Sequence, residues 1–345
     1  MIRADDRFQE RSIVTSLFFP QSRLFIAGNR KAAGTSLRWW LLPLHGIDVE
    51  ALTRDVVGRE LVSTEAVWAG LRSFRYIWKA LSTQEREDAL GSADVLRIAP
   101  IRHPVPKVFS AWSQKYLQLE PGFPESLPAG FPAPADRIES RDQIRDEFTA
   151  FASALGRTDR TWKGIDGHLY PQHLVLGAFL PDQATFIRTE DMDHGVELIR
   201  KHLAEHGIEA GPMPRFNEAV VPYQQDLISD TALEVITDMY QKDFTTFDYE
   251  EMVPPSKDKE VSFDWLNDVR DRNRHWGLAR DELTRLRQRV GGGSNRSAPR
   301  SGDADVQRLR RRVAELEREN AAMRTSTSWR VTTPLRALRA GRGGR

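Results

Sequence analysis

The sequence predicts an α/β protein with a mostly parallel central sheet, followed by a C-terminal helical and coiled-coil extension. Three observations lead to this prediction. The chain has 345 residues with 40% hydrophobic content, enough for one large domain and an appendage. Short β-branched and aromatic runs alternate with helical periodicity along most of the chain, which is typical of a sheet covered by helices on both faces. Towards the C-terminus, apolar residues recur at heptad spacing.

Four short apolar runs have the composition of strands. They span residues 13–19, 23–27, 94–101 and 184–188. Helical patterns predict helices at residues 35–42, 104–117, 141–155, 192–206 and 223–244. We expect Pro43 to end the first of these helices and Gly207 to end the fourth.

Two segments are predicted to be loops. Residues 28–34 join the second strand to the first helix and begin and end with glycine. Residues 120–136 hold five prolines, which favours an irregular structure. This longer loop has two interpretations, a mobile lid that faces substrate or a surface insertion that the fold tolerates.

Two heptad seams follow the domain. The seams consist of Val269, Trp276, Ala279, Leu283, Leu286 and Val290, and of Val306, Leu309, Val313, Leu316, Asn320 and Met323. Asn320 falls at an a position, which favours a parallel homodimer, and a single amphipathic helix lying on the domain is the alternative. The predicted boundaries are a domain at 1–255, a helical or coiled-coil segment at 256–290, a flexible linker at 291–305, a short coiled coil at 306–325 and a basic tail at 326–345.

The composition excludes several kinds of site. The chain has no cysteine, which excludes disulfides, thiolate zinc sites and a cysteine nucleophile. The formal net charge of +1 gives no argument for nucleic acid as a partner. The first ten residues lack the apolar core of a signal peptide, and no run of about 18 apolar residues predicts a membrane span. We therefore expect a cytoplasmic protein, either free or peripheral at the inner membrane face.

Residues 23–37 have the pattern of a phosphate cradle. A strand runs into a loop that opens a helix, and the amides and dipole at a helix N-terminus favour an anion. Gly34 allows a close backbone approach, Thr35 and Ser36 add hydroxyl donors, and Lys31 adds a charge. The lysine lies three residues before the glycine, unlike that of a nucleotide-triphosphate loop, so the pattern does not predict bound magnesium. A glycine-containing structural turn is the alternative.

A second anion pocket is indicated after the third predicted strand. Arg102 stands where that strand ends, and Ser110 lies eight residues later, about two turns into the next helix. A guanidinium and a hydroxyl at the carboxyl end of a strand suit a second phosphate. The alternative is a surface arginine capped by the fold.

Four segments resemble, in the same order, motifs of the carbohydrate sulfotransferases that use 3′-phosphoadenosine 5′-phosphosulfate (PAPS). The 5′-phosphosulfate loop of that family resembles RKAAGTS at residues 30–36, and its 3′-phosphate motif is similar to IRHPVPKVFSAW at 101–112. A third element with His, Pro and Gln resembles DGHLYPQ at 166–172, and the closing motif resembles YQKDFTTFDY at 240–249. The resemblance covers about residues 23–250.

This resemblance implies a P-loop-like three-layer fold, PAPS as the donor and no required metal. It implies that Lys31 lies at the bridging oxygen and acts in catalysis. The 5′-phosphate would be held by Arg30, Lys31, Ala32, Ala33, Gly34, Thr35 and Ser36, and the 3′-phosphate by Arg102 and Ser110. The sequence departs from the family pattern where Arg30 replaces a proline, Lys107 a frequent arginine, and Trp112 a tyrosine or phenylalanine.

The reaction also needs a general base for the hydroxyl proton. His168 is the first candidate because it lies in the third element, and a core or surface histidine is the alternative reading of it. His45 and Glu65 are poorer candidates.

The acceptor is expected to be a carbohydrate. Five tryptophans could stack on sugar rings or fill the core, namely Trp39, Trp40, Trp68, Trp78 and Trp162. Residues 325–336 resemble a C-terminal element of bacterial cell-envelope glycosyltransferases, which implies an envelope polysaccharide or glycolipid as acceptor and envelope-biosynthesis proteins as partners. Two rivals stay open: a non-catalytic scaffold of the same fold, and a nucleotide-dependent kinase that would require magnesium.

Overall fold

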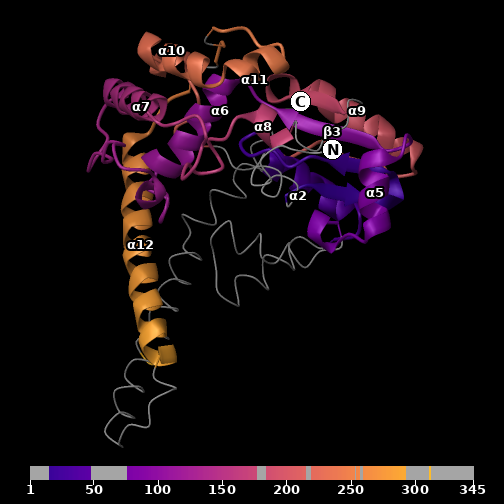
Figure 1. Cartoon of the computed structure of the whole chain (residues 1–345), viewed down its shortest axis with the longest axis horizontal. Coiled ribbons are helices and arrows are strands. Elements are labelled where there is room, and N and C mark those ends of the chain that lie inside the picture. Colours follow the sequence, from indigo (N-terminus) through magenta and orange to yellow (C-terminus); the bar gives the residue numbers. More distant parts are fainter. Residues whose placement is uncertain are drawn as a thin grey trace, which may run out of the picture.

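A computed structural model describes residues 15–47, 76–176, 184–214, 219–252, 254–256 and 259–292, together with Arg311. The start of the first predicted strand, Glu65, Trp68, nearly all of the predicted linker, the second heptad seam and the tail lie outside these residues. Figure 1 shows a sheet with helices around it, from which the long helix α12 (Phe263–Gly292) projects.

The sheet has four strands in the described residues, in the order β1-β2-β3-β4. They are β1 (Leu17–Phe19), β2 (Leu24–Ile26), β3 (Leu96–Ile101) and β4 (Thr185–Arg188). β1 runs antiparallel to β2, because the turn Pro20–Ser22 is too short for a parallel crossover. β2, β3 and β4 are parallel to one another. The α/β prediction is therefore confirmed, with a mixed sheet in which parallel pairings predominate.

Helices alternate with the strands. They are α2 (Gly34–Leu44), α5 (Thr83–Gly91), α6 (Pro104–Ala111), α7 (Arg141–Gly156), α8 (Gln172–Leu176), α9 (Met192–Glu205), α10 (Asp230–Met239), α11 (Gln241–Thr246) and α12. Sequence analysis did not predict α5, which begins at a capping box between Ser82 and Glu85. Helix α6 continues directly into the π-helical turn η3 (Trp112–Leu117).

Alternate residues of the strands face two hydrophobic cores. Leu24 and Ile26 of β2 lie in one core with residues of α2 and α9. Phe25, between them, lies in the other core with residues of α6, α7 and α10. Because successive side chains of a strand point to opposite faces, the helices cover both faces of the sheet.

The first predicted helix ends later than expected. Helix α2 contains Pro43 and ends at Leu44, rather than stopping before the proline. Pro43 lies in the last turn, so its missing N–H removes one helical hydrogen bond at the end of the helix and leaves the preceding turns intact.

The single helix predicted for residues 223–244 is wrong. That segment holds a 3₁₀ turn at Gln225–Leu227, then α10 and α11 as separate helices. Helix α10 starts only after Ser229, whose hydroxyl accepts a hydrogen bond from the N–H of Ala232. It ends at Met239, and the C-cap residue Tyr240 leaves helical geometry with φ −112° and ψ 18°. Tertiary contacts of Tyr240, described below, fix this break.

Helix α12 combines a docked part with a projecting part. Leu266, Asn267 and Arg270 in its second and third turns are buried against the domain. Further along, α12 extends away from the other elements (Figure 1). The coiled coil along its first seam stays a prediction. None of the described helices is long and apolar enough to cross a membrane.

Candidate functional site

The loop between β2 and α2 adopts a backbone conformation suited to an anion. Lys31 and Ala33 both have left-handed φ values, 65° and 54°. Left-handed residues between right-handed ones turn successive N–H groups towards one side, which makes an anion-binding concavity. Ala33 also occupies the N-cap position of α2 and offers no side-chain cap to its first amides. This backbone conformation is compatible with the predicted cradle, which stays a prediction.

The side chains of the cradle divide between core and site. Ala32 is fully buried in the fold, so only its backbone can meet a ligand. Thr35 and Ser36 lie in the first turn of α2, where hydroxyls reach an anion at the helix N-terminus. A methyl group on Gly34 would meet its nearest atom, a backbone oxygen, at 3.5 Å, which is an ordinary contact. The packing of the protein itself therefore does not require glycine at position 34.

The second predicted pocket meets the first. Arg102 follows β3 directly, and its Nη1 donates to the carbonyl oxygen of Lys31 at 3.3 Å. Burial lowers the pKa of Arg102, an effect that the charge of Glu190 opposes. The loop and Arg102, more than 60 positions apart in the chain, are therefore in direct contact.

Ser110 is buried in α6, three residues after Lys107 and four before Gln114 of the following π-helical turn. Gln114 accepts a hydrogen bond from Nζ of Lys31 at 2.5 Å. Nζ of Lys107 donates to the carbonyls of His168 and Tyr170 at 3.3 and 2.7 Å. Residues on both sides of Ser110 thus contact the predicted site.

The site carries an excess of positive charge around Lys31. Burial lowers the pKa of Lys31 well below its usual range, and the charges of Lys115 and Arg102 lower it further. Glu120 and Asp166 oppose this effect. An anion bound among these cations would favour their charged forms and relieve their mutual repulsion. The charges around Lys31 are therefore compatible with an anionic ligand.

His168 is held by a carboxylate. Its Nδ1 lies 2.5 Å from Oδ1 of Asp166, which also accepts from the His168 backbone N–H at 2.7 Å. Nη1 of Arg30 lies 3.4 Å from the same ring nitrogen. Burial lowers the pKa of His168, the hydrogen bond that the ring donates to Asp166 opposes this, and the charges of Lys31 and Arg30 add to the lowering. The lowered pKa favours the neutral ring, and the contact with the Asp166 carboxylate favours the tautomer in which Nδ1–H donates and Nε2 carries a lone pair.

His45, the other described histidine candidate, is the C-cap residue of α2. Nε2 of His45 lies 2.8 Å from Oγ of Ser22, and Nδ1 lies 2.8 Å from the carbonyl oxygen of Leu41. Its ring also stacks on Phe19 at a centroid distance of 4.0 Å. Both ring nitrogens of His45 are therefore engaged within the fold, which favours a structural role for it over that of the base.

A buried glutamine connects the loop after β2 with the end of β3. Oε1 of Gln172 accepts from Nδ2 of Asn29 and from the backbone N–H of Arg102, both at 2.9 Å. Its Nε2 donates to the carbonyl oxygen of Arg102 at 2.6 Å. One side chain thus fixes the end of β3 relative to the loop after β2. Sequence analysis included Gln172 only as a letter of the third element and gave it no role.

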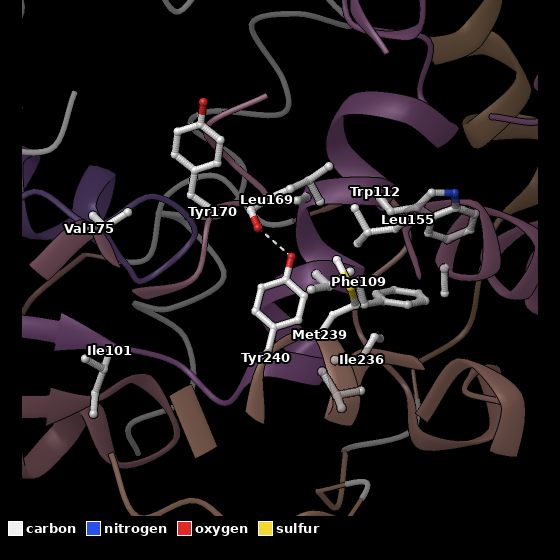
Figure 2. Packing of buried hydrophobic residues seen from close by; sticks show 14 of the residues in the cluster. Ile101, Phe109, Trp112, Leu155, Leu169, Tyr170, Val175, Ile236, Met239 and Tyr240 are labelled. Carbon is white, nitrogen blue, oxygen red and sulfur yellow. Dashed lines mark hydrogen bonds between the residues drawn. The ribbon is translucent and has the colours of Figure 1, made fainter. Parts of the chain in front are cut away.

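Residues of the fourth sequence element (240–249) hydrogen-bond to the backbone of the third (166–172). The carboxylate of Asp243 is fully buried and accepts from the backbone N–H groups of Gln172 and His173 at 2.7 and 2.8 Å, and from Nδ1 of His173 at 2.6 Å. The hydroxyl of Tyr240 donates to the carbonyl oxygen of Leu169 at 2.5 Å, within the packed core that Figure 2 shows. All four sequence elements therefore belong to one hydrogen-bonded network.

Sequence analysis gave no role to three residues of this network, Asn29, Asp166 and Asp243. Asp166 and Asp243 are letters of the third and fourth elements. An acidic residue two positions before a candidate base is also a local signal for Asp166. The roles of Asn29 and Asp243 depend on contacts with distant segments, which the sequence alone does not show.

No family model, curated protein or solved structure matches this chain. Among the described residues, no group of three or more His, Asp or Glu side chains could hold a metal ion, and the metal prediction stays a prediction.

The described tryptophans contribute to the core. Trp40 and Trp162 are almost fully buried. Trp39 and Trp78 are partly buried and pack against the two cores. We therefore withdraw Trp40 and Trp162 as candidates for stacking on a sugar, because neither has a free ring face.

Proposed function

We propose that this protein transfers a sulfuryl group from PAPS to a hydroxyl of a carbohydrate. The observation that carries the proposal is the contact of the Arg102 guanidinium with the Lys31 carbonyl. PAPS carries anionic groups at two ends of one nucleoside, so its site needs two anion pockets at a short, fixed separation. The helices on both faces of the mixed sheet are compatible with the P-loop-like three-layer fold that the motifs imply.

The donor set fits such a nucleotide. The amides of the 30–36 loop, with Thr35 and Ser36, would hold the 5′-phosphate at the N-terminus of α2. Arg102 and Ser110 would hold the 3′-phosphate. Bound PAPS supplies an activated sulfuryl group, with adenosine 3′,5′-bisphosphate as the product.

The residues of the chain would act by positioning and by charge. Lys31 would stabilise negative charge on the departing phosphate. Nε2 of His168 would accept the proton of the acceptor hydroxyl, and Asp166 would stabilise the imidazolium that forms. The cations that lower the pKa of His168 would be partly neutralised by the donor, so the ring becomes a stronger base when the donor is bound.

The acceptor and cellular setting are the less constrained part of the proposal. The tail motif supports an envelope polysaccharide or glycolipid, met by a cytoplasmic protein at the inner membrane face, with envelope-biosynthesis proteins as partners. A homodimer through the C-terminal coiled coil fits the heptad seams. The P-loop-like assignment and these settings rest on the sequence motifs.

Transfer of labelled sulfate from PAPS to fractionated bacterial envelope glycans tests the proposal. We expect the unaltered chain to label a glycan fraction, and Lys31→Ala and Arg102→Ala to abolish labelling while the fold survives. Arg145→Ala, at an exposed position of α7, is the matched control and should keep full activity. Wild-type-like turnover in a folded Arg102→Ala variant would contradict the assignment. A rise in melting temperature with ATP and magnesium, in place of one with adenosine 3′,5′-bisphosphate, would indicate a kinase. A melting temperature that responds to neither nucleotide would indicate a scaffold.

A further inference from the structure

A second buried lysine adjoins the predicted catalytic one. Lys115 lies in η3, the π-helical turn that continues α6, directly after the Gln114 that bonds Lys31. Its side chain is about nine-tenths buried, and its Nζ forms an ion pair with Glu120. π-helical turns of this kind are frequent at functional sites. The motif analysis gave Lys115 and Glu120 no role.

The backbone holds Glu120 against Lys115 by a strained turn. The N–H of Glu120 donates to the carbonyl of Lys115 at 2.8 Å, and the N–H of Leu119 to the carbonyl of Tyr116 at 3.0 Å. These two bonds form a Schellman motif, in which the left-handed position is usually glycine. Here Leu119 occupies it with φ 55°, a conformation that costs a branched side chain free energy.

Side chains of helix α12 hydrogen-bond to carbonyls of the turn at residues 117–120. The last carbonyls of a helix have no partner within the helix. Arg270, whose side chain is fully buried, donates to the carbonyl of Leu117, and Nδ2 of Asn273 donates to that of Gln118 at 2.7 Å. Two bonds between Asn267 and the backbone of Ile138 fasten the far end of the proline-containing loop. The turn that carries the ion pair is therefore fixed at both sides.

The charge of Lys115 acts on both halves of the predicted reaction centre. It lowers the pKa of Lys31, after the effect of burial, and it contributes to the lowered pKa of His168. The geometry that places Lys115 near Lys31 is its position directly after Gln114, whose Oε1 accepts from Nζ of Lys31, and the burial of its own side chain.

We propose that Lys115 is a second binding residue for the sulfuryl end of the donor, and that Glu120 is the counter-ion that neutralises it until the donor binds. The inference rests on the proposed function and names a residue that the motifs do not assign. Donor binding exchanges one anionic partner of Lys115 for another, so the buried ammonium is paired in both states. Removing the lysine should therefore affect PAPS, which has a sulfuryl group, far more than adenosine 3′,5′-bisphosphate, which has none.

Equilibrium binding of the two nucleotides to the full chain tests this. Lys115→Met keeps the aliphatic stem and removes the charge, and we expect PAPS affinity to fall about 10- to 100-fold, the loss of one charge-assisted hydrogen bond, while bisphosphate affinity changes less than about threefold. Glu120→Gln should raise PAPS affinity, and this gain should vanish in the Lys115→Met background. Lys201→Met, at an exposed position of α9, is the matched control and should change neither affinity.

The outcomes separate the inference from the proposed function. Equal effects of Lys115→Met on both nucleotides, or none on either, would overturn the inference and leave the proposed function standing. If Lys115→Met does not fold, Glu120→Gln decides, because unchanged PAPS affinity in that variant contradicts the role of Glu120. If the unaltered chain binds neither nucleotide, both the proposed function and this inference fall.

Discussion

The buried carboxylate of Asp243 is the point where a small change should most affect the scaffold of the site. It accepts three hydrogen bonds, from the N–H groups of Gln172 and His173 and from the ring of His173. In Asp243→Asn, the single amide oxygen can serve part of this set. The new NH₂ group must then face a buried N–H donor.

The cost can be worked from these contacts. A hydrogen bond to a charged group contributes about 1.5–3 kcal/mol, and a buried donor left without an acceptor costs about 1–3 kcal/mol. Loss of the charge and of one acceptor should therefore lower the free energy of unfolding by about 3 kcal/mol. For a domain of this size, that corresponds to a fall in melting temperature of roughly 6–12 °C.

Thermal and denaturant unfolding of Asp243→Asn measure this cost, with Asp248→Asn as the matched control. Asp248 is fully exposed, and its left-handed φ of 52° suits asparagine. The control should stay within about 0.5 kcal/mol of the unaltered chain. A melting temperature for Asp243→Asn equal to that of the control would contradict the stabilising role of the hydrogen bonds that Asp243 accepts from Gln172 and His173.

Three further predictions concern the cradle, a buried lysine and the sheet. Gly34→Ala should change the free energy of unfolding by less than about 1 kcal/mol, because the added methyl meets its nearest atom at 3.5 Å. The same variant should lose nucleotide affinity in calorimetry, and unchanged affinity would argue against a close approach of the nucleotide to the backbone at Gly34. Burial lowers the pKa of Lys107 to about 8 in the folded chain, against about 10.4 when unfolded. Between these pH values the unfolded chain binds more protons, so the unfolding free energy should rise with pH by up to about 3 kcal/mol. Denaturant unfolding from pH 8 to 10 should show a smaller rise in Lys107→Met, and identical slopes of unfolding free energy against pH in the two chains would contradict this. Gly195→Ala should destabilise the protein by about 1–3 kcal/mol in denaturant titration, because the methyl would lie 2.0 Å from Cγ2 of Ile187 where α9 packs on β4; Gly211→Ala, with no atom within 4 Å, is the control, and equal stability of the two variants would be the contrary result.

The parts of the fold that depend on local pattern could be predicted from the sequence. The strand at 94–101 follows from a mainly apolar run and the helix at 141–155 from helical periodicity, and the structure has β3 and α7 there. The cradle between β2 and α2 was also visible, because glycine and hydroxyl residues at a strand-to-helix loop are a local signal. The convergence of Arg102 on this loop needed the tertiary structure.

The parts that sequence analysis missed depend on contacts between distant segments. Hydropathy is continuous across Tyr240, so a single helix was predicted where the hydroxyl of Tyr240 reaches Leu169 and interrupts it. Asn29 bonds Gln172 across 143 positions. Polar residues of this kind look like surface residues in a sequence, and only the fold shows that they are buried and paired. The break at Ser229 was the exception, because serine before an acidic residue is a helix-start signal that could have been used.

The central claim is that the loop at 30–36 and Arg102 bind the two ends of one nucleotide. Calorimetric titration of the unaltered chain and of Arg102→Ala with adenosine 3′,5′-bisphosphate and adenosine 5′-monophosphate tests it directly. We predict that the unaltered chain prefers the bisphosphate by about 100-fold, the contribution of charged hydrogen bonds to the 3′-phosphate, and that Arg102→Ala loses most of this preference. An unaltered chain without preference, or a preference that survives the loss of Arg102, would contradict the account.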